Sequence, residues 1–308
     1  MVSFFIFMQS KHFLLPKINH INDFKTLARS ISLVENDTVQ GLDILQHLEP
    51  SAIPIIGITG PPGAGKSTLL NALLQLLLSQ GKKVGLVLID PSSPFNYGAL
   101  LGDRLRMSHH FNNPNLFIRS LASRGSLGGL SSKIIEVTEV MKSYAFDYIF
   151  VETVGVGQSE VEIAGLADAT VVVLVPEAGD SVQAMKAGIM EIADVFVINK
   201  ADRPDAELFY NNLSQQLHIN NRPDTPIVKT VAVQSIGIEE LLTTLQTTIA
   251  NKAKSPLRLQ LITDKVYRIL QEEKMKGFDK HHLKNAVASA MEEQSFSIFR
   301  FAKSVLKD

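Results

Sequence analysis

The stretch GITGPPGAGKSTLL, residues 57–70, decides the fold of this chain. Within it, Gly60-Pro61-Pro62-Gly63-Ala64-Gly65-Lys66-Ser67 matches G-x-x-x-x-G-K-[ST] at every fixed position, after a predicted strand and before a predicted helix. Glycines let successive backbone N–H groups turn toward a phosphate, and the start of the helix adds partial positive charge. We expect Lys66 to reach the β- and γ-phosphates, Ser67 to coordinate Mg²⁺, and Thr68 to complete the binding segment. A chance Gly-rich turn is the competing interpretation, and the strand and helix on either side count against it.

Short β-rich runs alternate with helical stretches on both sides of this segment, from Ile55 to about Val233. The runs are almost continuously apolar, as strands covered on both faces must be. Such alternation predicts an α/β fold with a doubly wound, mostly parallel sheet. The predicted strands are IIGIT, VGLVLI, DYIFVET, ATVVVLV, VFVIN and PIVKTV.

Helical extensions flank the predicted sheet. Apolar residues at helical spacing predict helices over 21–35 and 38–49, and the pattern becomes purely helical after Pro256. We therefore divide the chain into a leader with a helical extension (1–50), a nucleotide-binding domain (51–255) and a C-terminal helical segment (256–308). That last segment packs on the core or on a second subunit, and the pattern alone leaves both possibilities open.

Composition limits the classes of partner. The 308 residues carry 30 Lys+Arg against 31 Asp+Glu, so nothing indicates binding to nucleic acid or to an anionic membrane. The chain has no cysteine, which excludes disulfides and thiolate metal sites and is consistent with a reducing compartment. The apolar run near the N-terminus is far shorter than the ~20 residues of a membrane span, and it lacks the flanks of a signal peptide. We expect a cytoplasmic protein without membrane segments.

Two acidic residues at predicted strand ends indicate the metal side of the site. Asp90 ends LVLID and Glu152 ends YIFVE, so both fall beside the Gly-rich loop at the carboxyl edge of a parallel sheet. An acid that only caps the next helix is the alternative for either residue alone. Gly155 follows Glu152 in a loop whose backbone N–H is expected to sense the γ-phosphate.

The segment VINKAD identifies the base. In Asn199-Lys200-Ala201-Asp202, the carboxylate accepts hydrogen bonds from the guanine N1–H and 2-amino groups, which adenine lacks. The Lys200 stem is expected to lie along the base, and Asn199 to tie this loop to the Gly-rich loop. A backbone contact to guanine O6 is expected near Ala232. Four residues alone are a weak signal, but behind the phosphate motif they predict GTP, and GDP after turnover.

The segment VETVGVGQSEVEIAGLAD resembles the MeaB/ArgK-type GTPases, as do LARSISLVEN, LIDPSS, LGDRLRM and RGSLGGLS. These are dimeric P-loop GTPases that act as chaperones of adenosylcobalamin-dependent methylmalonyl-CoA mutase and related mutases. The resemblance implies a homodimer, a mutase client, switch I over 90–107, switch II from Glu152 and a mobile loop over 177–186. It also implies that Asp103 and Glu152 lie near Mg²⁺ and act with Lys66 in catalysis.

Two other functions compete with a mutase chaperone. A metal-delivery GTPase usually carries Cys motifs or a His-rich tail, whereas this chain has no Cys and only 8 His without a tract. A kinase or ATPase linked to arginine/ornithine transport is disfavoured by the guanine motif.

Slow intrinsic hydrolysis is expected because Val156, which cannot orient water, follows Gly155. Arg104, Arg106 and Arg124 are candidates for an arginine that speeds the reaction once a partner orders the loops.

Overall fold

The computed structural model describes residues 23–90, 112–122, 133–153, 159–176, 187–252, 256–275, 280–291 and 297–305. The chain forms two compact units, Met1–Arg258 and Leu259–Asp308. The division into 1–50, 51–255 and 256–308 stays a prediction. Among the described helices, none is long and apolar enough to cross a bilayer.

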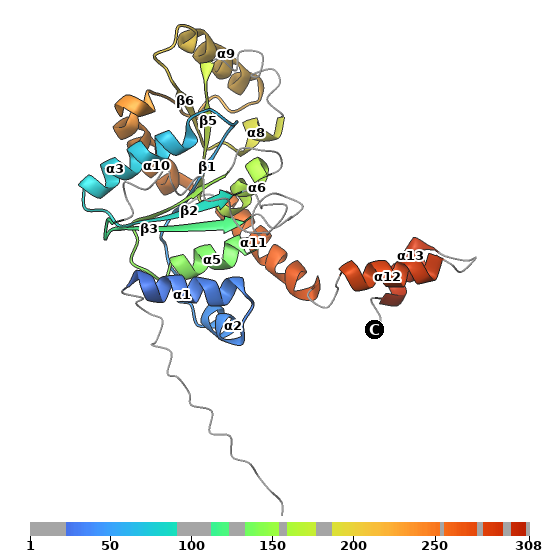
Figure 1. Ribbon diagram of the computed structural model, residues 1–308. Coiled ribbons are helices and arrows are strands. Elements are labelled where there is room, and N and C mark those ends of the chain that lie inside the picture. The colour runs from blue at the N-terminus through green and yellow to red at the C-terminus, as the bar shows by residue number, and fades with distance from the viewer. Residues whose placement is uncertain are drawn as a thin grey trace, which may run out of the picture. The chain divides into compact units, whose positions relative to one another are not determined.

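A seven-stranded sheet in the order β3-β2-β4-β1-β5-β6-β7 forms the centre of the first unit (Figure 1). Every neighbouring pair is parallel, so the predicted doubly wound α/β fold is confirmed. β1 lies between β4 and β5, which places the Gly-rich loop at the middle of the carboxyl edge. The strands are β1 (Ile55–Thr59), β2 (Val84–Asp90), β3 (Leu116–Ala122), β4 (Tyr148–Glu152), β5 (Ala169–Leu174), β6 (Val195–Asn199) and β7 (Ile227–Thr230).

β3 is the one strand that the apolar runs do not predict. Its sequence, LFIRSLA, is interrupted by Arg119 and Ser120, and three of its central positions are only half-buried. β3 is an edge strand, so it lacks a neighbour on one side and needs no continuous apolar run. Arg119 uses its charge to pair with Glu35 of the N-terminal helix.

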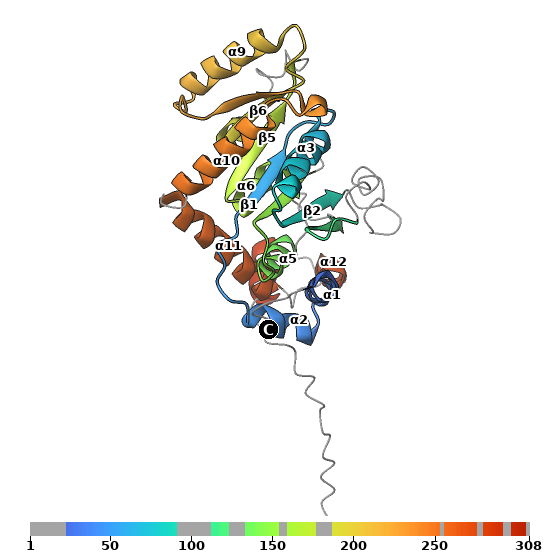
Figure 2. The same cartoon turned by 90° about the vertical axis from the view of Figure 1, so that its left-hand side faces the viewer.

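Helices cover both faces of the sheet (Figure 2). Alternate strand residues, such as Ile56 and Ile58 in β1, pack beneath α3 (Lys66–Ser79) and α10 (Ile238–Lys252). The other face packs beneath α1, α2, α5 and α6 near β1 to β4 and beneath α8 and α9 near β5 to β7. These helices are α1 (Phe24–Glu35), α2 (Val39–Gln46), α5 (Ile134–Met141), α6 (Ser159–Leu166), α8 (Ala187–Ile192) and α9 (Ala206–Ile219).

The two predicted N-terminal helices are α1 and α2. Asp23 caps α1 by accepting from the backbone N–H of Thr26 at 2.7 Å, and Leu27 and Ile31 are fully buried against the sheet side. Lys133, at the start of α5, reaches back to Asp37 in the α1–α2 turn at 2.7 Å. The helical pair is therefore part of the first unit's core.

The second unit is helical, as predicted. Its elements are α11 (Pro256–Met275), which begins in the first unit, α12 (Lys280–Met291) and α13 (Ile298–Val305). An apolar stripe along α11 has exposed side chains, and Phe299 of α13 is 84% exposed. The four stripe residues are Leu259, Ile262, Val266 and Ile269.

Candidate nucleotide-binding site

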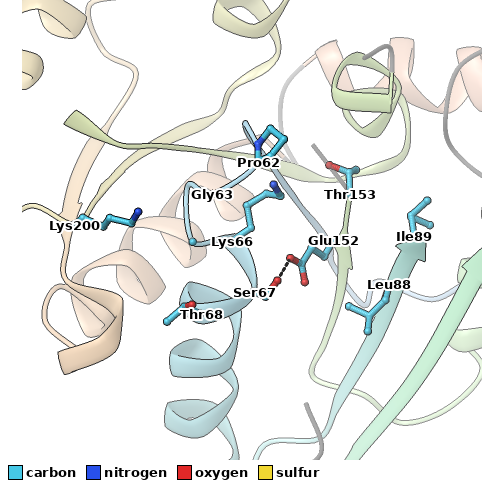
Figure 3. Close-up of a pocket in the computed structure, with 11 residues that line it drawn as sticks. Pro62, Gly63, Lys66, Ser67, Thr68, Leu88, Ile89, Glu152, Thr153 and Lys200 are labelled. Carbon is cyan, nitrogen blue, oxygen red and sulfur yellow. Dashed lines mark hydrogen bonds between the residues drawn. The ribbon is translucent and has the colours of Figure 1, made fainter. Parts of the chain in front are cut away.

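A cavity of about 550 Å³ opens at the carboxyl edge of the sheet, where β1, β2 and β4 end (Figure 3). The start of α3 forms one wall, and the residue after β6 forms another. Its lining is Pro62, Gly63, Gly65, Lys66, Ser67, Thr68, Leu88, Ile89, Glu152, Thr153 and Lys200. The structure thus brings together the Gly-rich loop, Glu152 and Lys200 of the N-K-A-D segment, as the sequence predicts.

Two glycines are required by the close packing of the phosphate loop. Gly60 has φ +139°, and a Cβ there would lie 2.1 Å from the carbonyl oxygen of Val173 in β5. Gly65 has φ +89° and precedes α3, where a Cβ would lie 2.4 Å from Nδ2 of Asn199. An L side chain would be strained at both positions, so the pattern reflects backbone geometry as well as phosphate binding.

Lys66 is buried in the concave side of this loop. Its ammonium donates to the carbonyl oxygens of Gly60 at 2.8 Å and Pro61 at 3.2 Å. In Figure 3 the side chain points from the first turn of α3 back toward Pro62. The loop therefore holds a cation at its centre, where the sequence places the β- and γ-phosphates.

The metal side is formed by two oxygen groups from different elements. Ser67 Oγ donates to Glu152 Oε1 at 2.7 Å, and Glu152 is buried at the end of β4. Hydroxyl and carboxylate oxygens are ligands that suit Mg²⁺, so this donor pair fits the predicted metal. Leu88 pairs with Glu152, which places the backbone of Asp90 two residues further along the same edge.

The side chain of Asn199 connects the phosphate loop to the base-reading segments. Its Nδ2 donates to the carbonyl of Ala64 at 2.9 Å. Its Oδ1 accepts from Thr230 Oγ1 at 3.1 Å and from the backbone N–H of Ala232 at 3.2 Å. The predicted tie between the two loops is present, and the Ala232 amide already has a partner within the protein.

Lys200 and Asp202 follow Asn199 in a turn. Lys200 has φ +56°, in the left-handed region that non-glycine residues seldom adopt. Lys200 lines the cavity and Asp202 is exposed to solvent, so both are accessible to a ligand.

Several predicted residues lie outside the described part of the chain. These are Asp103, Gly155, Val156, the three candidate arginines and the loops over 91–107 and 177–186. The side chain of Asp90 is likewise outside it.

Conversely, the sequence did not single out Thr59, Thr153 or Thr230, which hydrogen-bond beside the site. Their only signal was position: Thr59 precedes Gly60, Thr153 follows Glu152, and Thr230 lies two residues before Ala232.

A family model described as "Methylmalonyl Co-A mutase-associated GTPase MeaB" matches residues 27–290. The chain belongs to the MeaB family. Family membership confirms the resemblance stated from the sequence, and it makes this chain a P-loop GTPase that binds guanine nucleotides.

Relatives of similar sequence match about 70% of the length of this chain. A candidate GTPase of Pyrococcus abyssi is 50% identical over 229 residues, which cover 71% of this chain and 70% of the relative. GTPase ArgK of Escherichia coli is 36% identical over 229 residues, which cover 70% of this chain and 69% of the relative. A crystal structure titled LAO/AO transport system kinase covers 94% of both chains at 24% identity with a TM-score of 0.59, a likeness of fold.

Proposed function

We propose that this MeaB-family GTPase hydrolyses GTP with Mg²⁺ and gates cofactor loading or protection of an adenosylcobalamin-dependent acyl-CoA mutase. The observation that carries the GTPase part is the Asn199 side chain, which joins the phosphate loop and the N-K-A-D turn in one site. The family's description as mutase-associated supports the client. The protein is proposed to act in the cytoplasm.

Different residues of the site bind the phosphates, the base and the metal. The backbone N–H groups of the loop and the ammonium of Lys66 bind the phosphate oxygens, and the start of α3 adds favourable electrostatics. The carboxylate of Asp202 accepts from the guanine base. Ser67 and Glu152 would hold Mg²⁺, which neutralises charge on the phosphates. Roles for Asp90, Asp103 and Gly155 remain part of this proposal.

Positioning and electrostatics dominate phosphoryl transfer, so the arrangement of these groups sets the rate. The described residues would supply contacts to the phosphates and the base. We propose that a bound mutase completes the site, which makes the isolated GTPase slow. A partner-supplied group in other GTPases is worth about 10³–10⁵ in rate.

The test is GTP turnover by the full chain, with and without a purified adenosylcobalamin mutase from the same source. We expect slow turnover alone and an increase of at least about tenfold with the mutase. A Lys66→Ala chain serves as the control, because it loses the cation at the centre of the phosphate loop and should show no turnover in either condition. Fast turnover that no such mutase changes would contradict the proposal.

A further inference from the structure

Two successive residues at the end of β4 contact the two ends of the phosphate loop. Glu152 accepts from Ser67, the residue directly after Lys66, at 2.7 Å. The next residue, Thr153, donates from Oγ1 to Oγ1 of Thr59 at 2.9 Å, and Thr59 directly precedes Gly60. The loop from 60 to 66 is therefore contacted at both ends by one dipeptide, and Figure 3 shows the bond between Glu152 and Ser67.

The threonine pair continues the pairing of β1 with β4. Ile58 is the register partner of Glu152, and the backbone N–H of Thr153 donates to the Ile58 carbonyl at 3.1 Å. Thr59 and Thr153 thus face each other one residue beyond the last paired position. Both are buried, with exposed fractions of 0% and 1%. A buried hydroxyl–hydroxyl bond at this point fixes the strand end through side chains.

The contacts of Glu152 and Thr153 restrain the strand end from two directions. Successive side chains of a strand point to opposite faces, so one residue reaches α3 and the other reaches β1. A rotation of the β4 end that moved the Glu152 carboxylate away from Ser67 would break the threonine bond. We therefore expect the threonine bond to limit movement of the Glu152 carboxylate.

We propose that Thr153, through Thr59, is a positioning residue that holds the Glu152 carboxylate in the place from which it serves the nucleotide-bound metal. This inference rests on the proposed function of the same site. Groups that orient a metal-side ligand typically change metal affinity or activity by about 10–100-fold when they are removed. The competing interpretation is that the two hydroxyls only complete the packing.

Paired substitutions separate these interpretations. Thr153→Val alone leaves the Thr59 hydroxyl buried without its partner, which can destabilise the fold by itself. Replacing both residues, Thr59→Val with Thr153→Val, removes both hydroxyls at equal volume and is nearly neutral for stability. Thr153→Ser keeps the donor. Thr170→Val is the matched control, because Thr170 is a fully buried strand threonine whose hydroxyl has no hydrogen-bond partner among the described residues.

The experiment measures the affinity of the full chain for fluorescent mant-GDP, once with Mg²⁺ and once with EDTA. In the double variant we expect the gain in affinity from Mg²⁺ to fall by about tenfold, while the affinity in EDTA stays within about twofold. Thr153→Ser and Thr170→Val should keep the wild-type gain. Thermal unfolding in parallel shows that the double variant is folded.

A double variant with the wild-type Mg²⁺ gain would overturn the positioning role and leave the proposed function standing. A loss of affinity that is equal in Mg²⁺ and EDTA would also overturn it, because that result indicates general damage to the loop. Failure of the wild-type chain to bind mant-GDP would instead contradict the proposed function, and this inference with it.

Discussion

The side chain of Asn199 connects the phosphate loop to the segments expected to bind the base. Its amide contacts the phosphate loop at Ala64 and the loop after β7 at Ala232, from a buried position. Because one side chain fixes both loops, Asp202 is presented at a defined place relative to the phosphate site. In the proposed function, recognition of guanine would therefore depend on the exposed carboxylate of Asp202.

Asp202→Asn should change the base preference of the site from guanine to xanthine. The amide cannot accept from both guanine donors, but its N–H₂ can donate to the 2-oxo group of xanthine. Loss of a hydrogen bond to a charged group is worth about 1.5–3 kcal/mol, so GDP affinity should fall by about ten- to a hundredfold. Calorimetry with GDP and XDP measures this change. Asp205→Asn, the same change three residues later at the start of α9, is the control and should change neither affinity.

Among single residues, the sequence predicts those that belong to a motif with fixed spacing. The phosphate loop and N-K-A-D were recognisable because their fixed positions follow one another at defined spacing in the sequence. Thr59, Thr153 and Thr230 were not, because a threonine at a strand end is common and its partner is distant along the chain. Thr153 and Thr59 meet only through the pairing of β4 with β1, which no local pattern contains.

Among the elements, the contact of α6 with β1 leaves no space for a side chain at Gly57. A Cβ there would lie 2.5 Å from Cγ1 of Ile163 and 3.1 Å from Cβ of Ala167. Gly57→Ala should therefore lower the free energy of unfolding by about 1–3 kcal/mol through overpacking. Urea denaturation of the full chain measures this.

Gly165, in the same helix, provides the matched control. Nothing lies within 4 Å of a Cβ built there, and the residue is exposed. Gly165→Ala should raise the free energy of unfolding by about 0.5–1 kcal/mol, because alanine has the better helix propensity. Equal effects of the two substitutions would show that backbone entropy, and not the α6–β1 contact, governs both positions.

Strands buried on both faces were predictable from sequence, whereas of the two edge strands β7 was predicted and β3 was not. β1, β5 and β6 are buried at every position, and β4 at every position after Tyr148, so these strands form continuous apolar runs. β3 carries Arg119 and Ser120 because one of its edges has no strand partner. The order of the strands could not be predicted from local sequence patterns, because it depends on the pairing of segments that are distant along the chain.

At the scale of the whole molecule, we expect two copies to associate through the C-terminal unit. The stripe on α11 leaves Leu259, Ile262, Val266 and Ile269 exposed by 43–71%, and such a row is typical of a helix that packs on a partner. Replacing both Val266 and Ile269 by Glu should weaken the dimer about a hundredfold or more, because a buried unpaired carboxylate costs about 3–5 kcal/mol.

Light scattering across a concentration series measures this association. Asp264→Lys is the control, because helical spacing places Asp264 on the opposite side of α11 from the stripe. It should leave the dimer unchanged. A monomeric wild-type chain at all concentrations would contradict the homodimer.

The pairing of β1 has a consequence for biosynthesis. Ile56 lies between Phe150 and Ala169, so both neighbours of the strand that carries the phosphate loop leave the ribosome long after it does. Asn199 and Ala232, which fix the loop and the base side, follow later still. A nascent chain therefore carries the nucleotide motif without a sheet to support it. GTP cannot guide the early steps of folding and can stabilise only a first unit that is almost fully synthesised.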